Sequence, residues 1–254
     1  MSPQPPDAND SGLEVIDLGR MGYARAYEEQ VRHHAEVLEA RSLARPLLGR
    51  LLLVEHDPPV ITVSRRPEAA AHLLASPQSL ADHGIEVCPT DRGGDITYHG
   101  PGQLVVYPIL DLNRVGLNLH AYIRLLEQAV IDVCEGLGVP AGRDACATGV
   151  WVQRGGVTGS GCGASESAKV CAIGVRVRRW VSLHGLALNI STNLDHFGLI
   201  VPCGLAGRRV TSLQRELGER CPSMARAREM VALSLCAHID EARRTADRER
   251  SAAL

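Results

Sequence analysis

Residues 92–103, R-G-G-D-I-T-Y-H-G-P-G-Q, carry the densest set of groups that could bind a ligand. The stretch combines four glycines, a proline, a cation, an acid and a histidine. Glycine lets backbone N–H groups approach a ligand closely and adopt positive φ angles. A mostly apolar run over 104–112 follows at once and is typical of a strand buried on both faces. We therefore interpret 92–103 as a binding loop that leads into the core.

The cysteines and the one lysine are the candidates for nucleophilic chemistry. The chain has eight cysteines and a single lysine, Lys169. A lysine can exchange a proton whereas an arginine stays charged, so Lys169 stands either where an amine is required or as an ordinary surface residue. Cys171 shares a strand face with Lys169, and Cys203 lies between Pro202 and Gly204 in a loop that could present a thiol rigidly. The local sequence does not choose between the two thiols.

Two histidines, His99 and His184, each precede a glycine. A lone histidine is more often structural than catalytic, but this placement also fits a side chain held beside a ligand. The strong zinc spacings and the nucleotide-binding loops G-x-G-x-x-G and G-x-x-x-x-G-K-[ST] do not occur. We expect no metal and no cofactor.

The composition argues against several classes of function. The 254 residues are 45% hydrophobic and 22% charged, as in a globular protein. A net charge of −2 and 3% aromatic residues offer little for nucleic acid to bind. No apolar stretch approaches the ~20 residues of a membrane span, and the first residues lack the pattern of a signal peptide. We expect a cytoplasmic protein, without membrane or nucleic-acid contacts, whose cysteines are free thiols.

The elements that must position these residues alternate between strands and helices. We predict strands over 13–18, 51–54, 60–63, 85–88, 104–112, 149–153, 169–177 and 181–190, and helices over 23–45, 69–74, 118–137, 209–217 and 222–244. Mixed hairpins and helices indicate a mixed α/β (α+β) fold. We expect a disordered tail over 1–12, one domain over 13–244 and a polar tail over 245–254.

Four blocks of this sequence resemble one family, the lipoyl(octanoyl) transferases, also called lipoate–protein ligase B. Residues 92–108 fit the family pattern R-G-G-x-x-T-[aromatic]-H-G-P-G-Q-x-x-x-Y-P throughout. Lys169 to Arg176 fit K-[V/I]-x-[A/S]-[I/L]-G-[V/I/L]-R, His184 to Asn189 fit H-G-[L/F]-A-L-N, and 202–204 is the Pro-Cys-Gly loop. The resemblance spans about residues 13–240.

The resemblance implies a fold, an activity and a site. The fold is that of lipoate and biotin protein ligases, a mixed β-sheet with packed helices in one domain. The activity is transfer of an octanoyl group from octanoyl-acyl-carrier protein to a lysine of a lipoyl domain, the first step of endogenous lipoate synthesis. Cys203 would carry the acyl group as a thioester and Lys169 would be its partner. The implied substrate-binding residues are Arg92, Gly93, Gly94, Asp95, Ile96, Thr97, Tyr98, His99, Ala172, Ile173, Gly174, Gly185, Leu186 and Ala187.

The implied partners are octanoyl-acyl-carrier protein as donor, and the lipoyl domains of 2-oxoacid dehydrogenase E2 subunits and the glycine cleavage H protein as acceptors. Arg176, Arg178, Arg179, Arg208 and Arg209 lie near the catalytic blocks in sequence and could form a basic rim that steers acidic partners. Two rival functions stay open. One is an ATP-dependent lipoate or biotin ligase of the same fold, and the other is a non-catalytic module that binds carrier proteins.

Overall fold

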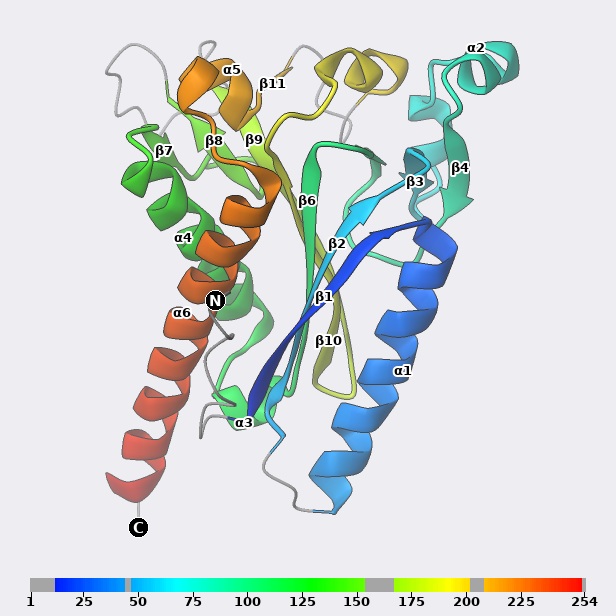
Figure 1. Cartoon of the computed structure of the whole chain (residues 1–254). Coiled ribbons are helices and arrows are strands. Elements are labelled where there is room, and N and C mark those ends of the chain that lie inside the picture. Colours follow the sequence, from blue (N-terminus) through cyan, green and yellow to red (C-terminus); the bar gives the residue numbers. More distant parts are fainter. Residues whose placement is uncertain (1–11, 44–46, 154–166, 202–207, 253–254) are drawn as a thin grey trace, which may run out of the picture.

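A computed structural model describes residues 12–43, 47–153, 167–201 and 208–252 of the chain. Within these ranges, an eight-stranded mixed sheet has the order β1-β2-β6-β10-β9-β8-β7, with β11 also paired to β9 (Figure 1). β1 runs parallel to β2 and β11 runs parallel to β9, while the other pairs are antiparallel. The strands are β1 Leu13–Met21, β2 Gly49–His56, β6 Gln103–Leu110, β7 Ala141–Gly142, β8 Val150–Val152, β9 Ala168–Arg178, β10 Val181–Asn189 and β11 Arg209–Val210.

Strand β6 lies at the centre of this sheet, and all of its residues are buried, as its apolar sequence predicts. Its side chains alternate between two cores because successive residues of a strand point to opposite faces. Leu104 and Val106 pack in one apolar cluster, whereas Val105 and Tyr107 pack in the other. The alternation lets one strand contribute to both layers and brings Tyr107 to the side on which the ligand cavity lies.

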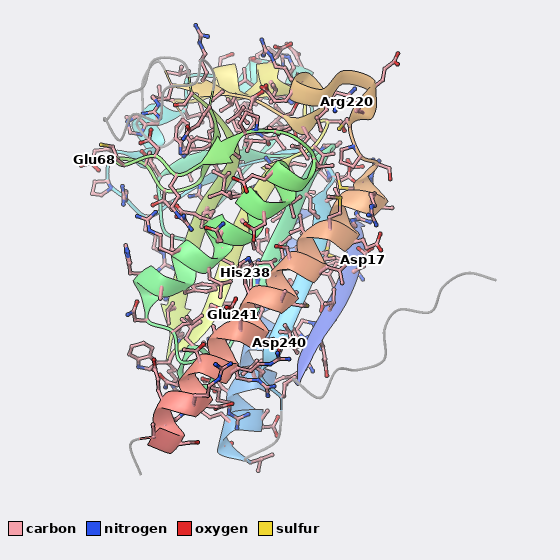
Figure 2. The ribbon with its side chains drawn as sticks, turned by 90° about the vertical axis from the view of Figure 1, so that its left-hand side faces the viewer. Asp17, Glu68, Arg220, His238, Asp240 and Glu241 are labelled. Carbon is pink, nitrogen blue, oxygen red and sulfur yellow. The ribbon has the colours of Figure 1, made fainter. Side chains whose placement is uncertain are left out.

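Helices cover both faces of the large sheet. α1 (Tyr23–Ser42) packs on the face of Val105, and α4 (Leu119–Gly136) and α6 (Met224–Ala252) lie side by side on the other (Figures 1 and 2). His238 of α6, labelled in Figure 2, places Nε2 2.6 Å from Asp132 Oδ2 of α4. Asn118 caps α4 as predicted, because its side chain accepts a hydrogen bond from the N–H of Ala121 at 2.9 Å.

The mixed α/β fold is therefore confirmed. The remaining helical segments are α2 Pro77–Asp82, α3 Leu112–Val115, α5 Leu213–Leu217 and the 3₁₀ turns Ala69–His72, Leu194–Leu199 and Gly218–Arg220. None of the helices in the described ranges is both long and apolar enough to cross a membrane.

A second sheet of three strands, in the order β4-β3-β5, was not predicted as a separate unit. It contains β3 (Val60–Val63), β4 (Glu86–Pro89) and β5 (Ile96–His99). β2 and β3 follow each other in the chain, but residues 57–59 lead from the large sheet to the small one. β5 also corrects the interpretation of 92–103 as a loop, because 96–99 forms a strand whose two apolar side chains, Ile96 and Tyr98, pack into a small core of their own.

The C-terminal helix is longer than predicted. α6 continues to Ala252, so the polar residues 245–252 form its last turns. Ala246 is buried, and a Cβ at Gly116 would lie only 2.3 Å from the Cβ of Ala246. Arg250 donates to the backbone carbonyls of Asn113 and Arg114. These contacts hold the last turns, which the polar sequence does not indicate. The predicted N-terminal tail lies outside the described residues, except for Gly12.

Candidate active site

A cavity lies between the large sheet and the segment around β5. Its empty volume is about 470 Å³, part of which is open to solvent. The lining residues that the sequence predicted are Arg92, Gly94, Thr97, His99, Ala172, Ile173, Gly174, Gly185, Leu186 and Ala187. Lining residues that it did not include in the site are Tyr23, Val105, Tyr107 and His184. The alternation of β6 beside the glycine-rich segment could have indicated Val105 and Tyr107.

Two predicted binding residues, Ile96 and Tyr98, point away from this cavity. Because 96–99 is a strand, Thr97 and His99 share one face and Ile96 and Tyr98 share the other. Ile96 and Tyr98 are 0% and 1% exposed and belong to the small apolar cluster. These two side chains therefore do not line the cavity described here.

Gly93 and Asp95 also lie outside the cavity lining, and they contact the segments that surround it. The N–H of Gly93 donates to the carbonyl of Val175 at 3.0 Å, and a Cβ at Gly93 would lie 2.7 Å from that oxygen. Only glycine allows this approach between the segment and β9. The buried Asp95 carboxylate lies 2.7 Å from His72 Nδ1. The carbonyl of His72 in turn accepts the N–H of Val201, the last described residue before 202–207.

Arg92 forms a charged part of the cavity wall and is itself 9% exposed. Its Nη2 donates to the carbonyl and the hydroxyl of Thr62 at 2.8 and 3.0 Å, and its Nε donates to the same hydroxyl at 3.1 Å. Nη1 donates to the carbonyl of Gly93 at 3.0 Å. These hydrogen bonds fix the orientation of the guanidinium in the cavity wall.

A buried hydrogen-bond chain assigns the tautomer of His99. Asn189 Nδ2 donates to the Thr211 carbonyl at 2.9 Å, so Asn189 Oδ1 accepts from Gln103 Nε2 at 2.9 Å. Gln103 Oε1 is then the acceptor for His99 Nδ1–H at 2.7 Å. This leaves Nε2 as the acceptor nitrogen of a ring that lines the cavity. Burial lowers the pKa of His99 well below its ordinary value, and the His56 ring and the Arg92 cation add to this.

Behind this wall, His56 and Tyr107 form a second neutral pair. His56 Nδ1 lies 3.2 Å from the Met21 carbonyl and therefore carries the proton, so Nε2 accepts from the hydroxyl of Tyr107 at 2.7 Å. Burial lowers the pKa of His56 to about 4. Tyr23, on the other side, shares a 2.6 Å hydrogen bond with Thr90, and burial raises its pKa. The polar groups of the cavity are therefore uncharged at neutral pH, apart from Arg92.

His184 is the second histidine that the sequence singled out, and it lines the cavity. It adopts a φ of 58°, which is unusual for a residue other than glycine. Its Nε2 lies 2.8 Å from Asp91 Oδ1, and Asp91 also pairs with Arg176. Burial, with the cations of Arg92 and Arg176, lowers the pKa of His184. The neutral ring donates to Asp91, which fixes its orientation against the cavity.

Lys169 lies on β9, three residues before the cavity wall begins at Ala172, or roughly 10 Å along the strand. Its Nζ donates to the Thr148 carbonyl at 3.1 Å and lies 4.7 Å from the centroid of the Trp151 ring. Cys171, the rival nucleophile, is 0% exposed in the apolar core, and burial raises the pKa of its thiol. A buried, un-ionised thiol is inert, so the geometry disfavours Cys171.

Cys203 falls in 202–207, outside the described residues. The described residues on either side of 202–207 form backbone hydrogen bonds with the rest of the structure. Val201 bonds to His72, and β11 pairs Val210 with Lys169, whose carbonyl accepts the N–H of Thr211 at 2.9 Å. β11, the first strand after 202–207, therefore lies beside β9 (Figure 1) and pairs Val210 with Lys169.

The predicted basic rim does not form as a unit. Arg176 pairs with Asp91, and Arg208 pairs with Asp144 at 2.5 Å. Arg178 lies at the opposite end of β9 from Lys169, nine residues or roughly 30 Å away. Only exposed Arg209 remains beside Lys169 without an ion pair among the described residues.

Among the described residues, no group of three or more His, Cys, Asp or Glu is placed to hold a metal ion. Cys146 is disulfide-bonded, so the expectation of free thiols does not hold there. The described cysteines that are free thiols are Cys88, Cys134, Cys171, Cys221 and Cys236.

The fold and this cavity place the chain among proteins of the lipoate-ligase type. Residues 26–235 match the family described as the lipoyl protein ligase A/B catalytic domain. A bi-partite lipoate protein ligase from Thermoplasma acidophilum and a lipoate-protein ligase A bound with ATP each share the fold at a TM-score of 0.62 and 16% identity. Each match covers 93% of this chain and 90% and 92%, respectively, of the other chain.

Closer relatives in sequence bear one name. The octanoyltransferase of Acidobacterium capsulatum is 45% identical over 81% of this chain and 80% of its own, and that of Chloroflexus aggregans is 44% identical over 90% and 95%. The octanoyltransferase of Bacteroides fragilis strain YCH46 is 45% identical over 88% and 96%. The chain belongs to the lipoyl protein ligase A/B family, in its octanoyltransferase group, as the four sequence blocks predicted.

Proposed function

We propose that this chain transfers an octanoyl group from octanoyl-acyl-carrier protein to the ε-amine of a lysine on a lipoyl domain, through a thioester on Cys203. The observation that carries the proposal is the position of Lys169. It occupies the same strand as the cavity wall at 172–174, at the end where β11 returns from the Pro-Cys-Gly segment. An acyl chain in the cavity would then present its carbonyl toward Lys169.

Bonds and protons balance over two half-reactions that need only Cys203, Lys169 and the two substrates. In the first, the Cys203 thiolate attacks the donor thioester, a new C–S bond forms, and the carrier thiolate leaves with the proton of the Lys169 ammonium. In the second, the acceptor amine attacks the enzyme thioester, the C–N bond forms, and Cys203 leaves as a thiolate. The now neutral Lys169 takes the proton that the amine loses, which restores the starting pair.

The chemistry requires no nucleotide, because the donor is already a thioester. Thiolate attack then exchanges one thioester for another of similar energy, and the amide formed in the second step is more stable. The acceptors would be lipoyl domains such as those of 2-oxoacid dehydrogenase E2 subunits and the glycine cleavage H protein. The Arg92 cation and the neutral histidines would line the binding site for the acyl group.

The test is incubation of the protein with octanoyl-acyl-carrier protein in the absence of ATP, followed by intact-mass measurement. We expect an octanoyl adduct that disappears in Cys203→Ser and that is lost again when an apo lipoyl domain is added. Cys221→Ser is the matched control, because Cys221 is a partly exposed free thiol outside the cavity lining.

Two other outcomes would replace the proposal. Transfer that occurs only with octanoic acid and ATP would identify an adenylating ligase. Tight carrier-protein binding without any adduct would identify a non-catalytic module.

A further inference from the structure

Lys169 is held by groups that do not neutralise its charge. No carboxylate of the described residues forms an ion pair with it; its polar contacts there are the Thr148 carbonyl at 3.1 Å and the Trp151 ring at 4.7 Å. Trp151 faces Lys169 directly across the β8–β9 ladder and is 1% exposed. Its indole N–H donates to the Ala147 carbonyl at 3.1 Å, which fixes the plane of the ring.

Asp144 and Glu127, two carboxylates in contact with residues around Lys169, are engaged by arginines. Asp144 accepts from Arg208, whose guanidinium carbon also lies 4.0 Å from the centroid of the same indole. Buried Glu127 accepts from Arg124 and Arg143 at 2.7 and 3.1 Å. It also accepts the N–H of Gly149, beside Thr148. These two carboxylates are thus compensated by arginines, and the Trp151 ring is the aromatic face that contacts the Lys169 ammonium.

We propose that Trp151 is a positioning residue that holds the Lys169 ammonium by a cation–π contact, in place of a carboxylate, so that its charge stays available to a thiolate. A carboxylate partner would hold the amine equally well but would cancel its field. An aromatic face attracts the cation through the ring quadrupole and adds no net charge. Arg208 stacks on the same ring, so one indole contacts two cations. This inference rests on the function proposed above.

The single lysine makes the contact directly observable. Protein grown with lysine labelled with ¹³C at Cε gives one Cε–Hε correlation, which belongs to Lys169. We expect the ring current of Trp151 to shift this proton signal upfield, and the shift to vanish in Trp151→Leu and to be partly kept in Trp151→Phe. Trp180→Phe is the matched control, because Trp180 is 51% exposed at the far end of β9 and should leave the signal unchanged. An unshifted wild-type signal, or one that Trp151→Leu does not move, overturns the inference.

A reciprocal measurement covers the case in which Trp151→Leu fails to fold. In a Trp180→Phe background, Trp151 is the remaining tryptophan, and Lys169→Met should alter its fluorescence emission without touching the core. Identical spectra overturn the cation–π contact. In the folded Trp151→Phe variant we expect the rate constant of octanoyl loading to fall within roughly a 3- to 30-fold range, with the KM for the donor unchanged. A rise in KM with an unchanged rate constant would assign Trp151 to substrate binding instead.

The two proposals fail separately. If no octanoyl adduct forms but the lysine signal is shifted by Trp151, the proposed function is wrong and the cation–π contact between Trp151 and Lys169 is still supported. If the adduct forms and the lysine signal shows no ring-current shift, only the proposed role of Trp151 is wrong.

Discussion

Gln103 and Asn189 join the glycine-rich segment to β10 through a buried hydrogen bond, in which Gln103 Nε2 donates to Asn189 Oδ1 at 2.9 Å. Both amides have their orientation fixed by backbone carbonyls, because Gln103 also donates to Tyr98 and Asn189 donates to Thr211. This series of hydrogen bonds starts at His99, which lines the cavity, and ends at the carbonyl of Thr211. Thr211 directly follows Val210, which pairs with Lys169 in β11 and β9. A hydrogen-bond chain with a single direction thus connects the cavity wall to the strand beside Lys169.

Replacing Gln103 by Glu should therefore destabilise the fold out of proportion to the change in size. A carboxylate would lose both N–H donors and would place a negative oxygen against the Tyr98 and Asn189 oxygens. We expect the free energy of unfolding to fall by about 2–3 kcal/mol, measured by urea denaturation at neutral pH. Gln78→Glu, on the exposed surface of α2, is the control and should change it by less than about 0.5 kcal/mol. Equal effects would show that the chain has no directional role.

The buried histidines should make the protein lose stability in mild acid. His56 has a folded-state pKa of about 4, below its ordinary value near 6.5. Between these values the unfolded chain binds a proton that the folded chain does not, so the free energy of unfolding falls as the pH falls from 6.5 to 4. The loss from His56 alone should be about 3 kcal/mol. Urea titrations at several pH values should show a shallower slope for His56→Gln than for the exposed control His120→Gln, and equal slopes would exclude the effect.

Gly174 should tolerate no side chain. It lies opposite Gly185 in the β9–β10 pair, and a Cβ there would lie 2.7 Å from the carbonyl oxygen of Gly93. We expect Gly174→Ala to displace the wall at Arg92, to slow octanoyl loading at least about tenfold, and to cost about 1–3 kcal/mol of stability. At Gly136 a Cβ meets nothing within 4 Å, so Gly136→Ala should be neutral or slightly stabilising. Normal loading by Gly174→Ala would mean that the acyl group lies elsewhere.

The Lys169→Arg variant separates the two half-reactions. A guanidinium keeps the positive charge that stabilises a thiolate but cannot take up a proton. The octanoyl adduct on Cys203 should still form, because the carrier thiolate can leave and take its proton from water. Transfer of the adduct to a lipoyl domain should slow by about 10²-fold or more, as measured by single-turnover mass spectrometry. Arg209→Gln, exposed beside Lys169, should leave transfer within about twofold if solvent screens its charge. Unimpaired transfer in Lys169→Arg would show that the amine acts by charge alone or takes no part.

The sequence by itself determined the class of fold, the central strand and most of the cavity wall. Apolar periodicity predicts β6 and α4 because burial on two faces, or on one stripe, leaves a local pattern. The glycines at 93, 174 and 185 are also visible in sequence, since close backbone approach excludes other residues. Lys169 is indicated by two independent features of the sequence: it lies in one of the family blocks, and it is the single lysine of the chain.

Only the tertiary structure decided which of these residues face the cavity. Ile96 and Tyr98 belong to the same motif as Thr97 and His99, but strand formation turns them into a different core. The polar residues at 245–252 gave no sign of a helix, because the contacts of Ala246 and Arg250 come from residues more than a hundred positions earlier. The same holds for Trp151, whose contact with Lys169 depends on strand register. Local sequence encodes propensity and burial, whereas facing partners are fixed by pairings between distant segments, which no local pattern records.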